Sequence, residues 1–361
     1  PDDAKYYTYE ETSGESPVWT WYDSRGRELR TEYFGYDDDK KIRVDKKYNP
    51  KGRVESVSKP YFANGDREWA ESFTYDNYGR TDTKTTPMGT TTMAYEGLTT
   101  TITTPRSVKV KTENAAGQTV SNKVDGRTVT FSYYPSGKVK TATPQGGKSV
   151  EMFYDTQGNR IKINDPDAGV VETTYNGFGE LTSEEYTMGS GEDERTVTTS
   201  YTYDGSGRLV ETDRNGKITD YKHNDSNGFL KSISNSDHKV TYTYDEGSNK
   251  HLGRATTVKE QIEGKAFIFK TSYDAFGREQ KHTYPSGFYV KNSYTKYGHL
   301  QQVKGSNGKS IWKGEEANAL DQFVKTKKGG KISTFGYDDK DRPENIYSPG
   351  IIDHFYKFND K

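Results

Sequence analysis

The chain has 361 residues, of which 52 are Lys or Arg and 53 are Asp or Glu, and it contains no cysteine. Leu, Ile, Val and Phe make up 56 of the 361 residues, which is below the roughly 20% that marks the border with disordered chains. Disordered chains are usually poor in aromatics and unbalanced in charge, whereas this one is 13% aromatic, with 29 Tyr. The composition therefore excludes disorder, a coiled coil, an ordinary helical bundle and disulfide or thiolate chemistry.

Two further classes are excluded by pattern. No stretch approaches the ~20 consecutive apolar residues that a membrane helix needs, so we expect no membrane span. A net charge of -1 gives no electrostatic reason to bind nucleic acid, and we expect no nucleic-acid partner. The basic run at Lys325, Lys327, Lys328 and Lys331 is interpreted as protection of an edge strand.

A short pattern recurs along the chain: Tyr, Asp or Asn, two variable residues, Gly and a basic residue. Its close copies are YDSRGR at Tyr22, YNPKGR at Tyr48, YDNYGR at Tyr75, YDGSGR at Tyr203 and YDAFGR at Tyr273. Looser copies begin at Tyr133, Tyr154, Tyr175, Tyr294 and Tyr337, and degraded copies fit the register at Tyr95, Glu113, Asn224, Tyr244, Ala317 and Tyr356. These sixteen positions lie about twenty residues apart, which predicts a repeat protein.

Longer intervals between copies indicate loop insertions. We place them in FGYDDDKK, in YFANGDRE, in residues 187–195 and in EGSNKHLG, where the turn glycine moves to Gly253. Length varies most easily where loops meet solvent.

Each repeat is expected to hold two strands. A second turn signal lies between successive Tyr-Asp motifs, at Thr86, Thr143, Asp213, Asn235, Tyr284 and Gly305. The runs between the turns are rich in Thr, Val and Tyr, as in residues 196–203 and 239–244, and these residues suit a half-buried pleated surface. The prediction is an all-β chain of about thirty short antiparallel strands, with one face wetter than the other.

The residues of the motif have a structural explanation. Asp or Asn accepts backbone N–H bonds, and the Gly supplies the positive φ that a type I turn followed by a bulge requires, so Ala at Gly79 or Gly207 is expected to be harmful. Arg27, Arg53, Arg80, Arg208 and Arg278 are expected to cover neighbouring rings. We assign a structural role to Tyr22, Asp23, Gly26, Arg27, Tyr75, Asp76, Gly79, Arg80, Tyr203, Asp204, Gly207, Arg208, Tyr273, Asp274, Gly277 and Arg278.

Motifs for catalysis and for metal binding are poor. The stretch that ends at residues 147–149 approaches a phosphate-binding loop but has Ala142 where Gly is needed. The six His do not recur at metal-ligand spacing. We therefore expect no enzyme, no metal and no cofactor.

The motifs YDSRGR, YDNYGR, YDGSGR and YDAFGR resemble the YD repeats of bacterial Rhs proteins, of the B and C components of Tc toxins and, more distantly, of teneurins. The resemblance covers the chain from Tyr22 to its end. It implies a long spiralling β-sheet that forms part or all of a hollow shell, which in the bacterial members encloses a toxic C-terminal polypeptide. The self-cleaving aspartates of that family are not carried onto Asp165 or Asp167, because NDPDAG falls where a hairpin turn is due.

The resemblance predicts one continuous repeat region over residues 1–361, belonging to a longer chain. Its function would be to encapsulate a toxin in bacterial competition or virulence, with the cargo polypeptide or other parts of the shell as partners. The protein would be secreted, placed on the cell surface or delivered by a bacterial secretion system. The alternative is a surface module that binds carbohydrate or a protein receptor, with Trp19, Trp21, Trp69 and Trp312 as the candidate residues.

Overall fold

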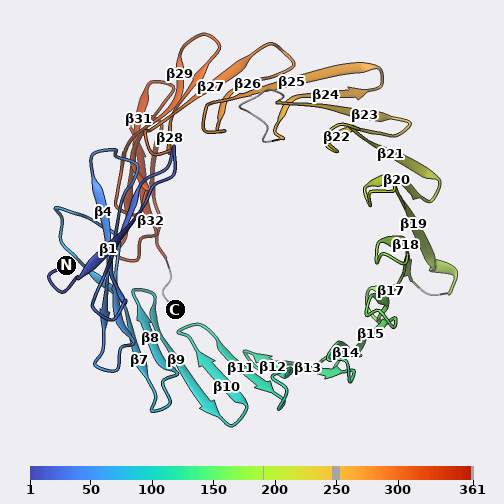
Figure 1. Ribbon diagram of the computed structural model, residues 1–361, viewed down its shortest axis with the longest axis horizontal. Coiled ribbons are helices and arrows are strands. Elements are labelled where there is room, and N and C mark those ends of the chain that lie inside the picture. Colours follow the sequence, from blue (N-terminus) through green and yellow to red (C-terminus); the bar gives the residue numbers. More distant parts are fainter. Residues whose placement is uncertain (190, 246–252, 359–361) are drawn as a thin grey trace. The chain divides into compact units, whose positions relative to one another are not determined.

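The computed structural model describes residues 1–189, 191–245 and 253–358, and the chain folds almost entirely into β-strands (Figure 1). Over these residues, 33 strands form one antiparallel sheet, and the single helical element is the 3-10 helix η1 (Gly191–Asp193). The prediction of an all-β chain of antiparallel hairpins with about thirty strands is confirmed. The predicted insertion EGSNKHLG lies almost wholly outside the described residues.

The chain divides into two units. The first unit comprises residues 1–94, 102–106 and 271–361, and the second comprises residues 95–101 and 107–270. The strands of the N-terminal part are β1 (Tyr6–Glu10), β2 (Val18–Tyr22), β3 (Glu28–Phe34), β4 (Lys41–Tyr48), β5 (Val54–Ser58), β6 (Tyr61–Phe62), β7 (Trp69–Tyr75), β8 (Thr81–Thr86), β9 (Gly89–Glu96) and β10 (Thr99–Thr103). Those of the central part are β11 (Val108–Glu113), β12 (Thr119–Val124), β13 (Arg127–Tyr133), β14 (Val139–Pro144), β15 (Val150–Tyr154), β16 (Arg160–Asp165), β17 (Gly169–Tyr175), β18 (Leu181–Met188), β19 (Arg195–Tyr203), β20 (Leu209–Arg214), β21 (Lys217–His223), β22 (Leu230–Ser234), β23 (His238–Tyr244), β24 (Ala255–Ile262) and β25 (Lys265–Tyr273). Those of the C-terminal part are β26 (Glu279–Thr283), β27 (Tyr289–Tyr294), β28 (Leu300–Gly305), β29 (Ser310–Ala317), β30 (Phe323–Lys328), β31 (Lys331–Tyr337), β32 (Pro343–Ser348) and β33 (Ile352–Phe355).

The two faces of the sheet differ in exposure. In β13, Val129, Phe131 and Tyr133 are half-buried on one face, and Thr130 and Ser132 are exposed on the other. Strand β9 alternates between half-buried and exposed residues along its whole length. This period of two is the pattern of an antiparallel sheet with one wet face, as predicted.

A β-bulge accompanies the tyrosine of the repeated motif. Tyr201 pairs with Thr212 and Tyr203 pairs with Leu209, so the register shifts between Thr202 and Tyr203. The same shift occurs at Tyr22, Tyr48, Tyr75, Tyr133, Tyr154, Tyr175, Tyr244, Tyr294 and Tyr337. The structure thus contains the bulge that the spacing of Asp and Gly predicts.

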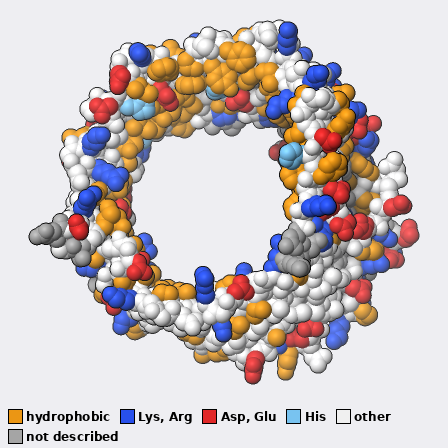
Figure 2. All heavy atoms as spheres, turned by 180° about the vertical axis from the view of Figure 1, so that it is seen from behind, with side chains coloured by type: hydrophobic (Ala, Val, Ile, Leu, Met, Phe, Trp, Pro, Cys, Tyr) orange, Lys and Arg blue, Asp and Glu red, His pale blue; other side chains and the backbone are white. Residues whose placement is uncertain are grey.

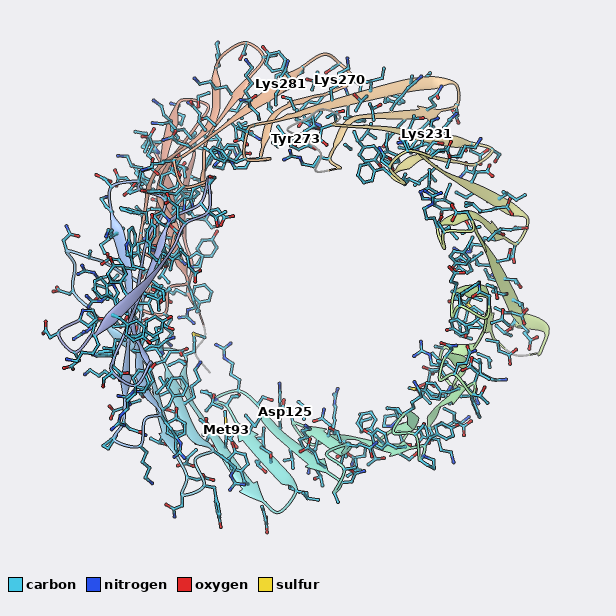
Figure 3. All side chains as sticks on the ribbon, viewed as in Figure 1. Met93, Asp125, Lys231, Lys270, Tyr273 and Lys281 are labelled. Carbon is cyan, nitrogen blue, oxygen red and sulfur yellow. The ribbon has the colours of Figure 1, made fainter. Side chains whose placement is uncertain are left out.

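Several hairpins close at their other end with a tight two-residue turn. Asp125, labelled in Figure 3, and Gly126 have φ values of 49° and 87° between β12 and β13, and Asn215 and Gly216 have 51° and 83° between β20 and β21. Two successive positive φ values define the turn whose twist matches that of the flanking strands. NDPDAG also forms a turn between two strands, since Asp165 accepts the N–H groups of Asp167 and Ala168.

The sheet has very little interior. Among the described residues, the hydrophobic side chains that are buried are Tyr36, Ile42 and Ala317. Figure 2 shows hydrophobic patches at the surface beside charged side chains of both signs, in agreement with the net charge of -1. A single sheet with both faces near solvent has no place for many buried Leu side chains, which explains why the chain has few of them.

Four sequence assignments need correction. His223 replaces Asn224 in the place of the motif tyrosine, because its Nε2 lies 2.9 Å from the carbonyl oxygen of Leu209 in the preceding strand. Tyr95 lies inside β9 and precedes no turn of the Tyr-Asp type.

The lysine run from Lys325 lies on β30 and at the start of β31. Because β30 is paired on both sides, these lysines do not protect an edge strand. The fourth correction, at Tyr356, depends on the contacts of the turn described below.

Replacing a turn glycine by alanine has two possible costs: backbone strain from the positive φ, and contact between the added Cβ and neighbouring atoms. Gly117 has a φ of 75° and an added Cβ would meet nothing within 4 Å, so Gly117→Ala is expected to reduce local stability by about 1–2 kcal/mol from backbone strain alone. Gly207→Ala is expected to cost a similar amount, because its Cβ would crowd only Oε1 of Glu180, at 2.7 Å, and the end of that flexible side chain can move aside. Native-state hydrogen exchange of each turn measures both effects. Gly205 lies in the same turn as Gly207 without a positive φ, so an equal loss in Gly205→Ala would contradict this explanation.

Candidate functional site: the repeated turn and the seam of the first unit

The carboxylate of the motif aspartate organises its turn. Oδ1 of Asp204 accepts the N–H groups of Ser206 and Arg208 at 2.9 and 3.0 Å, and Oδ2 accepts Nε–H of Arg208 at 2.7 Å. Two backbone bonds close the turn, from Asp204 N–H to the Arg208 carbonyl and from Gly207 N–H to the Asp204 carbonyl. The same pattern holds Asp23, Asp76, Asp274 and Asp338 with Arg27, Arg80, Arg278 and Arg342.

These bonds favour the charged carboxylate. The side-chain bond from Arg208, with the backbone N–H bonds, lowers the pKa of Asp204 to about 2. At Asp76, burial opposes ionisation, and the bonds from Arg80 overcome it and lower the pKa. The first residue of the turn therefore carries a negative charge, which is paired with the positive charge of the arginine four residues later.

The first and fifth residues of the turn form matched pairs. In some turns asparagine replaces the aspartate and the fifth residue supplies an acceptor: Asn114 Nδ2 donates to Oε1 of Gln118 at 2.7 Å, and Asn176 Nδ2 donates to Oε2 of Glu180 at 2.6 Å. At Asn49 the fifth residue is instead Arg53, whose backbone N–H donates to Oδ1 of Asn49. Asn318 and Gln322 repeat the first of these arrangements at 2.8 Å. These three turns thus keep a side-chain bond between their first and fifth residues although the charges of the pair differ from those of Asp and Arg.

In most repeats the tyrosine hydroxyl joins the repeat to the preceding one, and Tyr154, whose hydroxyl contacts Sδ of Met152, is an exception. Tyr203 donates to the carbonyl oxygen of Leu181 at 2.9 Å, and Tyr75 donates to that of Val54 at 2.7 Å. The acceptor is the residue that directly follows the turn of the preceding repeat. Tyr48, Tyr133, Tyr244, Tyr294 and Tyr337 donate in the same way to Glu28, Thr119, Leu230, Glu279 and Phe323.

The cation of one turn also covers the ring of the next motif. Arg27 lies 4.7 Å from the ring centre of Tyr48, and Arg278 lies 4.5 Å from that of Tyr294. Arg53 over Tyr75, at 5.5 Å, and Lys138 over Tyr154, at 5.2 Å, follow the same rule. Each such contact contributes ~0.5–1 kcal/mol when exposed.

This rule corrects the last predicted repeat position. Arg342 lies 4.2 Å from the ring centre of Phe358. Phe358 therefore takes the place of the motif tyrosine that was assigned to Tyr356.

The sixteen residues singled out by sequence form four separate turns. Tyr22 stacks on Tyr6, with ring centres 5.1 Å apart, and Tyr273, labelled in Figure 3, ends β25. Gly26, Gly79, Gly207 and Gly277 all have positive φ. The four turns belong to four different hairpins, between β2 and β3, β7 and β8, β19 and β20, and β25 and β26.

A second feature is a seam within the first unit, defined by contacts of residues 14–59 with residues 276–341. The hydroxyl of Tyr36 donates to the carbonyl oxygen of Gly314 at 2.7 Å, and its backbone N–H donates to Oδ1 of Asp321 at 2.8 Å. Lys59 Nζ donates to the Asp339 carbonyl at 2.9 Å. Figure 1 shows the blue N-terminal strands beside the red C-terminal strands in this unit.

Sequence reasoning missed this seam. FGYDDDKK was interpreted as a solvent-exposed loop insertion, but Tyr36 is only 7% exposed, and burial together with nearby carboxylates raises its pKa to about 12. The one signal in the sequence is that Tyr36 lies outside the positions of the repeated motif. Its acceptor lies 278 residues away, which no local pattern can indicate.

The first unit also holds a buried ion network beside a groove of about 930 Å³. Asp45 is 3% exposed and is bound by Arg30, Arg67 and the hydroxyl of Tyr61. Burial opposes its ionisation, but these bonds prevail and lower its pKa to about 2. The cations of this network are thus already paired with Asp45.

The four tryptophans proposed for ligand binding are half-buried, and each contacts other side chains of the protein. Trp19 lies against Tyr9 and under Lys41, and Trp21 lies against Tyr7. Trp69 lies between Lys47 and Arg67, at 4.5 and 4.8 Å, and Trp312 packs on Phe323. These contacts do not favour the carbohydrate-binding alternative.

Within residues 1–189, 191–245 and 253–358, no group of three His, Cys, Asp or Glu side chains is placed to hold a metal ion. The same residues include no helix long and apolar enough to span a membrane.

The tyrosine link can be tested by removing one oxygen atom. Tyr203→Phe is expected to reduce the stability of its repeat by about 0.5–1.5 kcal/mol, because the Leu181 carbonyl loses its partner. Hydrogen exchange in β19 and β20 measures the loss. Tyr78→Phe is the control, since Tyr78 is 84% exposed, and an equal effect there would contradict the assignment.

The matched pair across the turn predicts compensation. Asp204→Asn is expected to increase exchange of the Gly207 amide several-fold, and adding Arg208→Gln is expected to restore protection, since Asn114 and Gln118 form that pair naturally. A double variant no better protected than the single one contradicts the pairing.

The same turn is expected to respond to acid. The folded pKa of Asp204, about 2, lies below the ordinary value of 3.8, so its stabilisation is complete above the ordinary value and is lost as pH falls toward 2. Exchange of the Gly207 amide in the wild-type chain should show this loss between about pH 4 and 2, after correction for intrinsic exchange. The double variant Asp204→Asn, Arg208→Gln lacks the titrating group and should show no such loss.

Comparison with known proteins gives matches among solved structures. No protein-family model matches the chain, and a search of curated proteins finds no match. The crystal structure of TcdB2-TccC3-Cdc42 matches with a TM-score of 0.79 at 15% identity over 98% of this chain, and that of TcdB2-TccC3 matches with 0.78 at 15% identity over 95%. A Photorhabdus luminescens Tc holotoxin pore matches with 0.53 at 14% identity over 95%.

The chain spans 22% of the length of the chains that it matches. At this identity the likeness concerns the fold. The chain therefore has the fold of the matched part of the TcdB2-TccC3 structures, in agreement with the resemblance of its repeated motifs to the Rhs/YD-repeat family.

Proposed function

We propose that these repeats are part of the shell of a bacterial toxin, and that this shell encloses a toxic polypeptide until delivery. The observation that carries the proposal is the likeness to TcdB2-TccC3 over 98% of the chain. The matched chain is longer than this one, which spans 22% of it, and the matched complex is named TcdB2-TccC3-Cdc42. We propose secretion, or delivery as part of a toxin complex, on the same grounds.

A sheet built from these repeats has the properties that the wall of a shell needs. Eight of the motif tyrosines donate to the backbone carbonyl that follows the preceding turn, so one repeat positions the next. Stability in such a chain is a sum of repeat and neighbour contributions, and the sheet extends without a thick core. We propose a structural role for the motif residues and no catalytic role for the repeats.

The proposal is tested by protease protection of the complete gene product. Proteinase K is added in native buffer and, separately, after the repeats are unfolded in urea, and surviving peptides are identified by mass spectrometry. Sequence outside the YD repeats is expected to survive with the repeats in native buffer and to be digested at least tenfold faster after unfolding. Peptides of an equimolar unfolded protein added from outside serve as the control for protease activity.

Two outcomes would overturn encapsulation. One is equal digestion of the non-repeat sequence in native buffer and in urea. The other is a gene product that has no non-repeat sequence and copurifies with no other polypeptide. A destabilised variant, Gly207→Ala, should show earlier loss of protection with rising urea than Gly205→Ala does.

A further inference from the structure

Three lysines face one another across neighbouring strands of the first unit. Lys281 of β26 pairs with Lys291 of β27, and Lys291 pairs with Lys304 of β28. Directly paired residues of an antiparallel sheet lie on the same face, with Cβ atoms about 4.5–5.5 Å apart. The three side chains therefore form a row across the sheet, the lysine row, whose first member is labelled in Figure 3.

The lysine row has no carboxylate to balance its charge. Like charges directly opposite one another destabilise a sheet. Elsewhere in the fold facing lysines have acidic partners: Lys162 faces Glu172 and binds it at 2.6 Å. A second pair of facing lysines, Lys313 and Lys327, has Glu315 at 3.1 Å from Nζ of Lys313. Within the described part of the chain, by contrast, no member of the lysine row forms an ion pair.

The lysine row borders a hollow of about 470 Å³. Tyr289 lies beside it, and the centre of its ring is 4.0 Å from Nζ of Lys281 and 5.8 Å from Nζ of Lys291. The ring attracts both cations but carries no charge that could neutralise them. The other described residues that line the hollow include no acidic and no aromatic residue; they are Ser272, Gln280, Asn292 and Ser293.

We infer that this hollow binds a compact oligophosphate, a ligand with two or three linked phosphoryl groups. Such a ligand supplies the negative charge that the lysine row lacks. Lysine binds phosphate as a point charge, whereas carboxylates are matched best by the planar fork of arginine. The row crosses three strands and therefore spans roughly 10 Å, which favours several linked phosphoryl groups over one. Nucleic acid is disfavoured, because the described lining residues offer no ring on which a base could stack.

Titration calorimetry of the complete gene product with inorganic triphosphate, at constant ionic strength, tests the inference. Lys291→Gln removes the middle charge of the lysine row and is expected to weaken binding at least tenfold. Lys327→Gln removes one of a facing pair of lysines outside the hollow and is expected to change the dissociation constant less than twofold. Inorganic monophosphate is expected to bind at least tenfold more weakly than triphosphate.

Four results would overturn the inference. Saturable binding that is absent at millimolar triphosphate excludes the site. Equal weakening by Lys291→Gln and Lys327→Gln indicates general electrostatic attraction. Equal affinity for monophosphate and triphosphate indicates an adventitious ion only. A sulfated hexasaccharide that displaces triphosphate and binds at least tenfold more tightly indicates an extended polyanion in place of an oligophosphate.

Unfolding in urea gives an independent readout. Without ligand, Lys291→Gln is expected to raise the urea midpoint at low ionic strength, because it removes repulsion between facing ammonium groups, and added NaCl should reduce the difference. Triphosphate is expected to raise the midpoint of the wild-type chain but not that of Lys291→Gln.

A lower midpoint for ligand-free Lys291→Gln overturns the inference, since the lysine row would then stabilise the sheet by itself. An equal rise with triphosphate in the wild-type chain and in Lys291→Gln also contradicts binding at the row. Neither readout depends on an enclosed cargo, so the proposed function and this inference can fail separately.

Discussion

The structure depends on one hydrogen bond that is repeated along the sheet, from a tyrosine hydroxyl to the backbone carbonyl that follows the preceding turn. A carbonyl at a strand start has a second lone pair that the ladder does not use. The phenol supplies its proton from the next repeat, as Tyr203 does for Leu181. Because the bond passes from repeat to repeat, the turn geometry at one position fixes where the next hairpin begins.

The turn must be rigid for this bond to form, and the aspartate provides that rigidity. Its carboxylate accepts two backbone N–H groups and the arginine side chain, and the arginine also lies over the next tyrosine, as Arg27 does over Tyr48. Asp, Gly, Arg and Tyr thus act as one unit spread over two repeats. The spacing near twenty residues follows from this unit, since one hairpin must return the chain to the same edge.

The fold and the repeated turn could be predicted from the sequence because their bonds are local. Asp204 and Arg208 are four residues apart, and a period of two reveals which strand face is wet. The seam could not be predicted, because Tyr36 and Gly314 belong to no shared pattern. Two of the three register errors occurred where the marker residue changed type, with His223 and Phe358 in the place of tyrosine. The third occurred at Tyr95, a tyrosine within β9 that precedes no turn of the Tyr-Asp type.

The exchange of Asp–Arg for Asn–Gln at the two ends of a turn has an evolutionary consequence. Each turn can lose a cation and an anion together, as at Asn114 and Gln118, while the hairpin keeps its shape. The charge on the surface of one turn can therefore differ from that of the next turn without a compensating change elsewhere in the fold. A chain built in this way can acquire a new neighbour by altering single turns, because its architecture and its surface chemistry are encoded by different residues.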